Sequence, residues 1–264
     1  MRIKQIFISI AIALISSTLA HAQTTKDIGL ICLNPHIPET EALGQKATSM
    51  LTSKLQQIAT TNGMSGAGFD NRFIITAHIQ KLKSSQTQTF PQKNAVEISI
   101  GIYVGDGLDG TLYSSYNCEE KGIGSSEDQA IAAAVRKVNP NQEELQRAII
   151  KGKEMILKYY DKMSGNIIKT AKATAAAGRY EDAINMLFAI PMNNKDFQTA
   201  QSLIAQYGSA SLDHKNLDVI RQARSAWSAN PTEEGATQAN KLLENLESPS
   251  AKIQAEAKQL QVEM

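Results

Sequence analysis

The hydrophobic periodicity of the chain changes near Pro140, and this change most limits what the chain can fold into. Before Pro140, three segments alternate apolar and polar residues with period two, as strands with one buried face do. These segments are 72–82, 95–104 and 111–121. After Pro140, apolar residues recur at spacings of three and four, which is typical of amphipathic helices. The sequence therefore predicts an α+β chain. A small α/β sandwich domain, one sheet with two helices, spans 23–140, and an all-α helical-hairpin region spans 141–264.

Two further elements and one turn complete the predicted α/β domain. A short strand is expected over 27–33, and an amphipathic helix is expected from Glu39 to about Ile58. The last two strands are joined by GDGLDG, residues 105–110. Aspartates among glycines can bind calcium, but the distal glutamate of a complete calcium loop is missing. Asp-Gly pairs between strands favour a hairpin, which is the interpretation we adopt.

The first residues have the features of a secretory signal peptide. Arg2 and Lys4 precede a short apolar run over 6–15, and residues 20–22 (AHA) offer the small side chains that signal peptidases read. We expect cleavage after Ala22, and an uncleaved anchor helix is the alternative. No later segment approaches the roughly 20 apolar residues that a membrane-spanning helix needs. The mature chain is therefore predicted to be periplasmic or secreted, without an integral membrane span.

The net charge of the chain bears on which partners it can attract. Removing residues 1–22 takes away two basic residues and no acidic one, so the formal net charge falls from +1 to −1. A nearly neutral chain has no broad electrostatic field that attracts nucleic acid, which is not an expected partner.

The two cysteines, Cys32 and Cys118, both fall in predicted strands. An exported protein can form a disulfide between them, and two separate buried thiols are the alternative.

A glycine-containing turn precedes a predicted helix at residues 121–135, KGIGSSEDQAIAAAV. Phosphate-binding turns look similar, but Glu127 occupies the place of the third glycine of a dinucleotide fingerprint. Acidic residues in the first turn of a helix stabilise its positive end and repel a phosphate there. We therefore interpret Gly122 and Gly124 as a structural turn, with Ser126 as the helix cap in a capping box with Gln129.

This strand, glycine turn and helix resemble the end of a small α/β domain of bacterial envelope proteins. The resemblance is to the amino-terminal domain of the TolB type and to its relatives in curli-secretion channel proteins. It covers 27–138 and rests on the element order and one short motif. Domains of this family generally act in assembly and protein contact and are not catalytic. The lipidated cysteine of the curli type is absent here, so direct anchoring to the outer membrane is not implied.

The helical region contains a second resemblance. Residues 175–191, AAAGRYEDAINMLFAIP, are similar to the second half of a tetratricopeptide repeat, with Gly178 in the turn, Tyr180 and Ala183 at the expected spacing, and Pro191 closing the unit. A weaker copy lies at 230–249. Two copies are fewer than a free-standing solenoid needs. An irregular helical bundle is the alternative.

No pattern of a catalytic or metal site stands out in the sequence. The three histidines of the mature chain lie far apart, and no nucleophile elbow is present. We expect no catalytic residue, cofactor or metal, and we expect a non-enzymatic cell-envelope protein that mediates protein–protein interaction or assembly. Trp227, Tyr159 and Tyr180 are the candidate interface residues, although packing explains aromatic residues on apolar stripes as well.

Two other functions stay open. One is an exported hydrolase whose groups are dispersed along the sequence, with His78, His36 and Asp70 as the natural suspects. The other is a periplasmic binder of a small ligand that uses the open face of the sheet. For the protein-binding function, the expected partner is another envelope protein.

Overall fold

The computed structural model describes residues 30–66 and 71–264. The predicted signal peptide (1–22) and Asp70 lie outside the described residues. No helix within the described ranges is both long and apolar enough to cross a membrane.

The described chain divides into two compact units. We call residues 30–167 together with 188–198 the α/β unit, and residues 168–187 together with 199–264 the helical unit. The division falls later than the predicted boundary after residue 140. The predicted α+β class is confirmed, because a four-stranded sheet is followed by helices to the end of the chain.

Helix α4 (Glu143–Ala176) explains the later boundary. Leu145, Ile149 and Ile156 of its first part are buried in the same core as the sheet. The period of an amphipathic helix shows that it has an apolar face but does not say what covers that face. The boundary after residue 140 is therefore corrected, since the apolar stripe after Pro140 completes the α/β unit.

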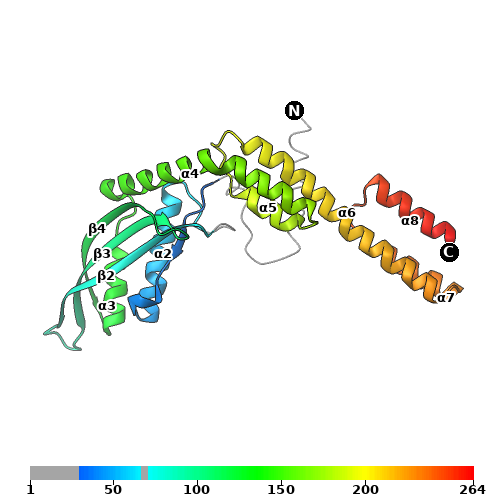
Figure 1. The fold of residues 1–264 in the computed structure, drawn as a ribbon. Coiled ribbons are helices and arrows are strands. Elements are labelled where there is room, and N and C mark those ends of the chain that lie inside the picture. The colour runs from blue at the N-terminus through cyan, green and yellow to red at the C-terminus, as the bar shows by residue number, and fades with distance from the viewer. Residues whose placement is uncertain (1–29, 67–70) are drawn as a thin grey trace. The chain divides into compact units, whose positions relative to one another are not determined.

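The sheet has the order β1-β2-β3-β4, and Figure 1 shows β2, β3 and β4 side by side. Its strands are β1 (Asn34–His36), β2 (Phe73–Gln86), β3 (Asn94–Asp106) and β4 (Leu112–Gly124). β1 is parallel to β2, and the other pairs are antiparallel. The three long strands agree with the alternating segments of the sequence. The short first strand lies after the predicted 27–33.

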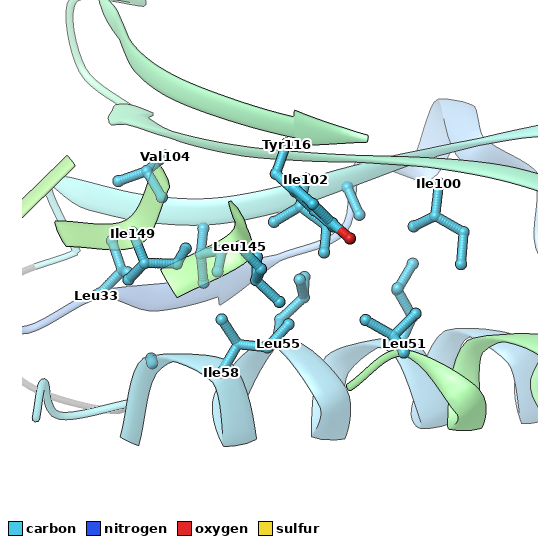
Figure 2. Packing of buried hydrophobic residues seen from close by; sticks show 14 of the residues in the cluster. Leu33, Leu51, Leu55, Ile58, Ile100, Ile102, Val104, Tyr116, Leu145 and Ile149 are labelled. Carbon is cyan, nitrogen blue, oxygen red and sulfur yellow. The ribbon is translucent and has the colours of Figure 1, made fainter. Parts of the chain in front are cut away.

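Three helices cover one face of this sheet. These are α2 (Gln45–Thr61), α3 (Glu127–Lys137) and the first part of α4. Side chains of α2 and α4 point at the buried side chains of β3 and β4 in Figure 2. The buried residues of β3 alternate along the strand and are Val96, Ile98, Ile100, Ile102 and Val104. The opposite face carries no helix of the α/β unit and is more polar.

The predicted first helix is broken near its start. Glu39–Glu41 form a short 3-10 turn, η1, and α2 begins only at Gln45. Ala42 between them has φ of 47°, in the left-handed region, which no residue of a continuous right-handed helix adopts. The predicted start at Glu39 is therefore corrected to Gln45.

The helical unit contains the end of α4 and four further helices. They are α5 (Tyr180–Phe188), α6 (Phe197–Ala229), α7 (Glu233–Leu243) and α8 (Ala251–Glu263). Ile220, Leu243 and Leu260 belong to the core that joins α6, α7 and α8. The side-chain amide of Asn216 donates to Glu247 O (2.9 Å) and accepts from Glu247 N (3.0 Å), which ties the α7–α8 loop to α6.

The residues that suggested a tetratricopeptide repeat form a helical hairpin. Gly178 has φ of 79° in the turn between α4 and α5, where a side chain would be strained. Ala183 and Leu187 of α5 are fully buried. The hairpin is present, and its relation to the tetratricopeptide family stays a prediction.

Shortening a core side chain of β3 tests this packing. Ile100→Ala removes a fully buried side chain, and we expect it to lower the free energy of unfolding by about 2–5 kcal/mol. Ile123→Ala is the matched control, because this side chain of β4 is 57% exposed and the change should stay within about 0.5 kcal/mol. Urea denaturation of both variants measures the difference. Equal losses would contradict the assignment of the covered face.

Candidate functional site

The two glycines at the end of β4 let helix α3 pack against this strand. A Cβ atom on Gly122 would lie 1.9 Å from Ala130 O, and one on Gly124 would lie 2.5 Å from Ala130 N. Ser126 caps the helix, since its Oγ accepts from Gln129 N at 3.2 Å. Glu127 forms an ion pair with Lys81. The turn therefore holds a helix close to a strand, and the start of the helix is capped by the Ser126 hydroxyl.

Helix α2 lacks a side-chain cap of its own and receives one from α3. Its N-cap residue is Gly44, which offers no side-chain acceptor. The carboxylate of Asp128 accepts from Lys46 N (3.1 Å) and from Ala47 N (2.9 Å). These are two of the backbone donors that a helix start leaves without an intrahelical partner. A residue 81 positions away along the chain thus satisfies the start of α2.

At the other end of the pair the roles are exchanged, and a side chain of α2 binds the backbone at the end of α3. Lys54 Nζ of α2 donates to Arg136 O (3.0 Å) and Val138 O (2.8 Å), where α3 ends. A cation at the carbonyl end of a helix is favourable. Burial, and then the charge of Arg136, lower the pKa of Lys54. Together with Asp128, these contacts hold α2 and α3 side by side and parallel.

A groove of about 690 Å³ lies along this helix pair. Two of the side chains that line it are charged, Lys46 near the start of α2 and Arg136 near the end of α3, and both are basic. Neither forms an ion pair with any residue of the described ranges. The rest of the lining is small, polar or apolar and comes from Gln45, Ser49, Met50, Ser53, Ile123, Gly124, Gln129, Ala132 and Ala133.

The two cations of the groove are far apart along its length. Lys46 is level with Asp128, which binds its backbone, and Arg136 follows Asp128 by eight positions on α3. At 1.5 Å per helical residue, this spacing is about 12 Å. The groove can therefore bind an anionic group at each end and small side chains between them.

The predicted interface residues lie elsewhere. Tyr159 packs edge-on against Phe73, with ring centroids 5.2 Å apart, and the guanidinium of Arg72 lies 4.4 Å from its ring centroid. Tyr180 contacts Tyr207 in the helical unit. Trp227 packs against the core of α6, α7 and α8. The structure does not bring these three aromatic residues into one site, and each has a packing partner.

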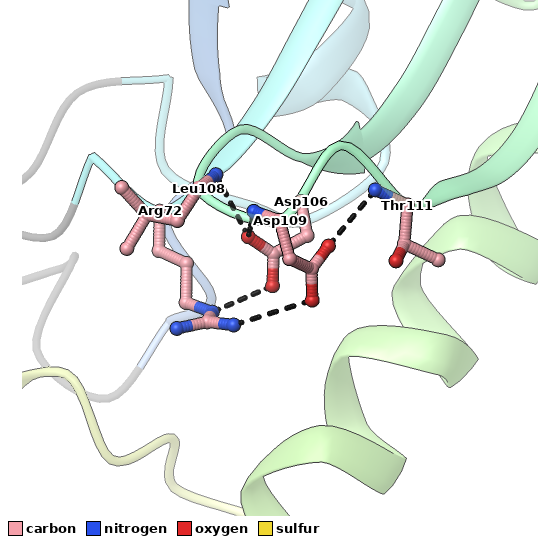
Figure 3. A network of polar contacts seen from close by, with 5 residues as sticks. All are labelled: Arg72, Asp106, Leu108, Asp109 and Thr111. Carbon is pink, nitrogen blue, oxygen red and sulfur yellow. Dashed lines mark hydrogen bonds and ion pairs between the residues drawn. The ribbon is translucent and has the colours of Figure 1, made fainter.

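The Asp-Gly turn between β3 and β4 is a hairpin closed by a polar network (Figure 3). The buried carboxylate of Asp106 accepts from Arg72 Nε (2.6 Å) and Leu108 N (2.9 Å). Asp109 accepts from Thr111 N (2.8 Å), and this hydrogen bonding and Arg72 lower the pKa of Asp109. The aspartates that suggested calcium therefore bind backbone amides and an arginine.

Two of the candidate hydrolase residues, His36 and His78, lie on the neighbouring strands β1 and β2, where His36 pairs with Thr76. His78 Nδ1 lies 2.8 Å from Glu41 Oε1, and Glu41 Oε2 accepts from Ile79 N at 3.0 Å. His36 lies in β1, and His214 is in α6. No cluster of three potential metal ligands occurs within the described ranges. The contact of His78 with Glu41 was not predicted, because Glu41 is 37 positions away.

The possible disulfide between Cys32 and Cys118 is wrong for this fold. No bond joins these two described cysteines. Cys32 lies two residues before the start of β1 and bridges to Ser65, whereas Cys118 lies in β4 at the other edge of the sheet. Strands are about 4.8 Å apart, so three strand spacings far exceed the roughly 7 Å between Cα atoms that a disulfide allows.

The open face of the sheet, suggested as a ligand surface, carries paired charges. Glu97 of β3 lies between Lys83 of β2 (3.6 Å) and Lys121 of β4 (3.4 Å). Glu97 balances only one of the two lysine charges, but both lysines are engaged in ion pairs with it. Because Lys46 and Arg136 have no such partner within the described ranges, the groove between α2 and α3 is the better candidate for binding.

No protein-family model matches the chain, and no curated protein does. A minor lipoprotein from Acinetobacter baumannii matches with a TM-score of 0.29 and 12% identity over 47% of this chain and 94% of that chain.

Two other solved structures are similar over about the same length. A candidate lipoprotein from Caulobacter crescentus matches with a TM-score of 0.24 and 13% identity, over 50% of this chain and 90% of its own. A candidate neuraminyllactose-binding haemagglutinin homologue from Helicobacter pylori matches with a TM-score of 0.25 and 12% identity, over 52% of this chain and 90% of its own. The resemblance to TolB-type domains stays a prediction.

Removing the Asp128 carboxylate, which caps the start of α2, tests whether this contact stabilises the α2–α3 pair. Asp128→Ala leaves two helix-start amides without their acceptor, and we expect a loss of about 0.5–2 kcal/mol of unfolding free energy. Asp128→Asn keeps one acceptor oxygen and should lose less. Glu154→Ala, at an exposed position of α4, is the control and should change little. Thermal and urea unfolding measure the stability of all three variants. A loss of stability in Glu154→Ala with none in Asp128→Ala would contradict the assignment.

Proposed function

We propose that this chain is an exported, non-enzymatic cell-envelope protein that binds another protein, and that the groove between α2 and α3 holds an acidic segment of that partner. The observation that carries the proposal is the lining of the groove. Its charges are two unpaired basic side chains, Lys46 and Arg136, at opposite ends. A positive surface complements acidic side chains and steers their approach.

The size of the groove supports a short segment. Extended peptide advances about 3.3 Å per residue, so the roughly 12 Å of helix length that separates the levels of Lys46 and Arg136 corresponds to about four residues. Ala132 and Ala133 leave room for backbone between them, and Ser49 and Ser53 offer hydroxyls for hydrogen bonds. The partner segment therefore has acidic residues about four positions apart if it binds extended.

The predicted signal peptide supports an envelope location. Its cleavage would place the mature chain outside the cytoplasm, where the available partners are other exported or membrane-attached proteins. Enzymatic activity is not part of this proposal.

A binder of a small anion is the second candidate function. The groove volume of about 690 Å³ lies in the range of small-molecule sites, and the same two cations would bind the ligand. Native mass spectrometry of the protein purified from its own cells distinguishes the two candidates. A constant added mass of a few hundred daltons, lost when the two cations are reversed, would favour the small anion.

Charge reversal in the groove tests the protein-binding proposal. A photo-crosslinking residue placed at Ser53 should give a discrete protein adduct in the cells that make this chain. Lys46→Glu with Arg136→Glu should abolish the adduct, because both attractive contacts become repulsive. The adduct should also weaken as salt rises in the extracted envelope, since salt screens exposed charges.

The matched control reverses two other exposed charges of the α/β unit. Lys158→Glu with Lys162→Glu on α4 changes the net charge equally and lies outside the groove. This variant should keep the adduct at Ser53. Equal adducts in all variants, or loss in both double variants, would contradict a specific role of the groove.

A further inference from the structure

The two edges of the sheet differ in how they are protected. β1 has three residues, one of which is Pro35, and it pairs parallel with β2. β4 has 13 residues and contains no proline. Short strands and prolines block the pairing of an edge with another chain, whereas a long regular strand invites it. β4 is therefore the edge of this sheet that is open to a further strand.

The outer edge of β4 is accessible in the α/β unit. β3 pairs with it on one side, and no strand of the described ranges pairs with it on the other. Its register with β3 is regular from Ser114 to Gly124, after one irregularity beside Val104. Helix α3 packs beneath its face at Gly122, so the helix covers the face of the strand rather than its edge.

Exposed apolar side chains mark both ends of this edge. Leu112 is 58% exposed and Ile123 is 57% exposed. Leu112 pairs with Gly105 and Ile123 with Ala95, so both lie on the uncovered face of the sheet. In an antiparallel pair of two β4 strands, Leu112 of each copy comes close to Ile123 of the other. Two apolar contacts are then removed from water at the ends of the interface.

The charges of β4 select one register for such a pair. Full overlap of two antiparallel strands over 112–124 centres the pair on Cys118. Glu119 then faces Asn117 of the other copy, and Lys121 faces Ser115. Pairs centred on Glu119 or Glu120 would instead place like charges directly opposite each other, which is destabilising. The register with the greatest overlap thus opposes no like charges.

We infer that two copies of this chain pair through β4, antiparallel and centred on Cys118, and join their sheets into one sheet of eight strands. The occupant of the β4 edge is a second copy of the chain. The inference does not rest on the function proposed for the groove between α2 and α3, although Ile123 at the end of β4 also lines that groove.

Opposite charge changes at one exposed position test the pairing. Sedimentation of residues 23–264 under reducing conditions should show a dimer. Ser115→Glu places a carboxylate opposite Lys121 of the other copy, twice per dimer, and should lower the dimer dissociation constant about 2- to 30-fold. Ser115→Lys places like charges there and should raise it by a similar factor. Circular dichroism checks that both variants are folded.

Cys118 provides a test of the register. Directly opposite Cα atoms of antiparallel strands are about 4.5–5.5 Å apart, within the range of a disulfide. With Cys32→Ser in place, the added oxidant diamide should take one electron and one proton from each Cys118 thiol and leave a disulfide-linked dimer. Cys118→Ser in the same background should give none.

Three results would overturn the inference. One is a monomer at every concentration under both reducing and oxidising conditions. Another is a dimer whose dissociation constant shifts in the same direction, or not at all, in Ser115→Glu and Ser115→Lys. The third is a dimer that diamide does not link through Cys118, which would show a different interface.

Discussion

The charged contacts at the two ends of the α2–α3 pair determine the arrangement of the α/β unit. Asp128 supplies the cap that α2 lacks, and Lys54 binds the carbonyl end of α3. Because each contact joins a side chain of one helix to the backbone end of the other, the two helices cannot slide without losing both. The groove between them is a consequence of this fixed spacing.

Helix α3 of this pair packs closely against the sheet because two residues at the end of β4 are glycines. Gly122 and Gly124 let the backbone of α3 approach β4 more closely than any residue with a Cβ atom would allow. The apolar side chains of β3 alternate, so only one face of the sheet needs cover. Three helices cover that face, and the other face and the β4 edge are left to solvent or to a partner.

Local patterns in the sequence predicted the local structure well. The three long strands, the hairpin at Asp106 and the start of α3 all follow from residues that are neighbours along the chain. The true position of β1 and the start of α2 depend on contacts with distant segments, which a single sequence does not display. The boundary in α4 was missed for the same reason, because an apolar stripe does not name the surface that it packs against.

The candidate site was largely hidden from sequence analysis. Lys46 and Arg136 are isolated charges with no local motif, and they line one groove only because Asp128 binds a helix 81 positions away. The available signal was indirect: a run of small residues over 132–134 marked where α3 can be approached closely. The aromatic residues Tyr159, Tyr180 and Trp227 attracted attention instead, and the structure gives each of them a packing partner.

Amide hydrogen exchange at Lys46 and Ala47, measured by NMR, tests most directly whether α3 caps α2. Amides at a helix start normally exchange quickly because they lack intrahelical acceptors. In the native protein, both should exchange far more slowly than an unstructured chain. In Asp128→Ala both should lose this protection while the amide of Ile100 keeps it. Fast exchange at Lys46 and Ala47 in the native protein, or protection that survives Asp128→Ala, would contradict the account.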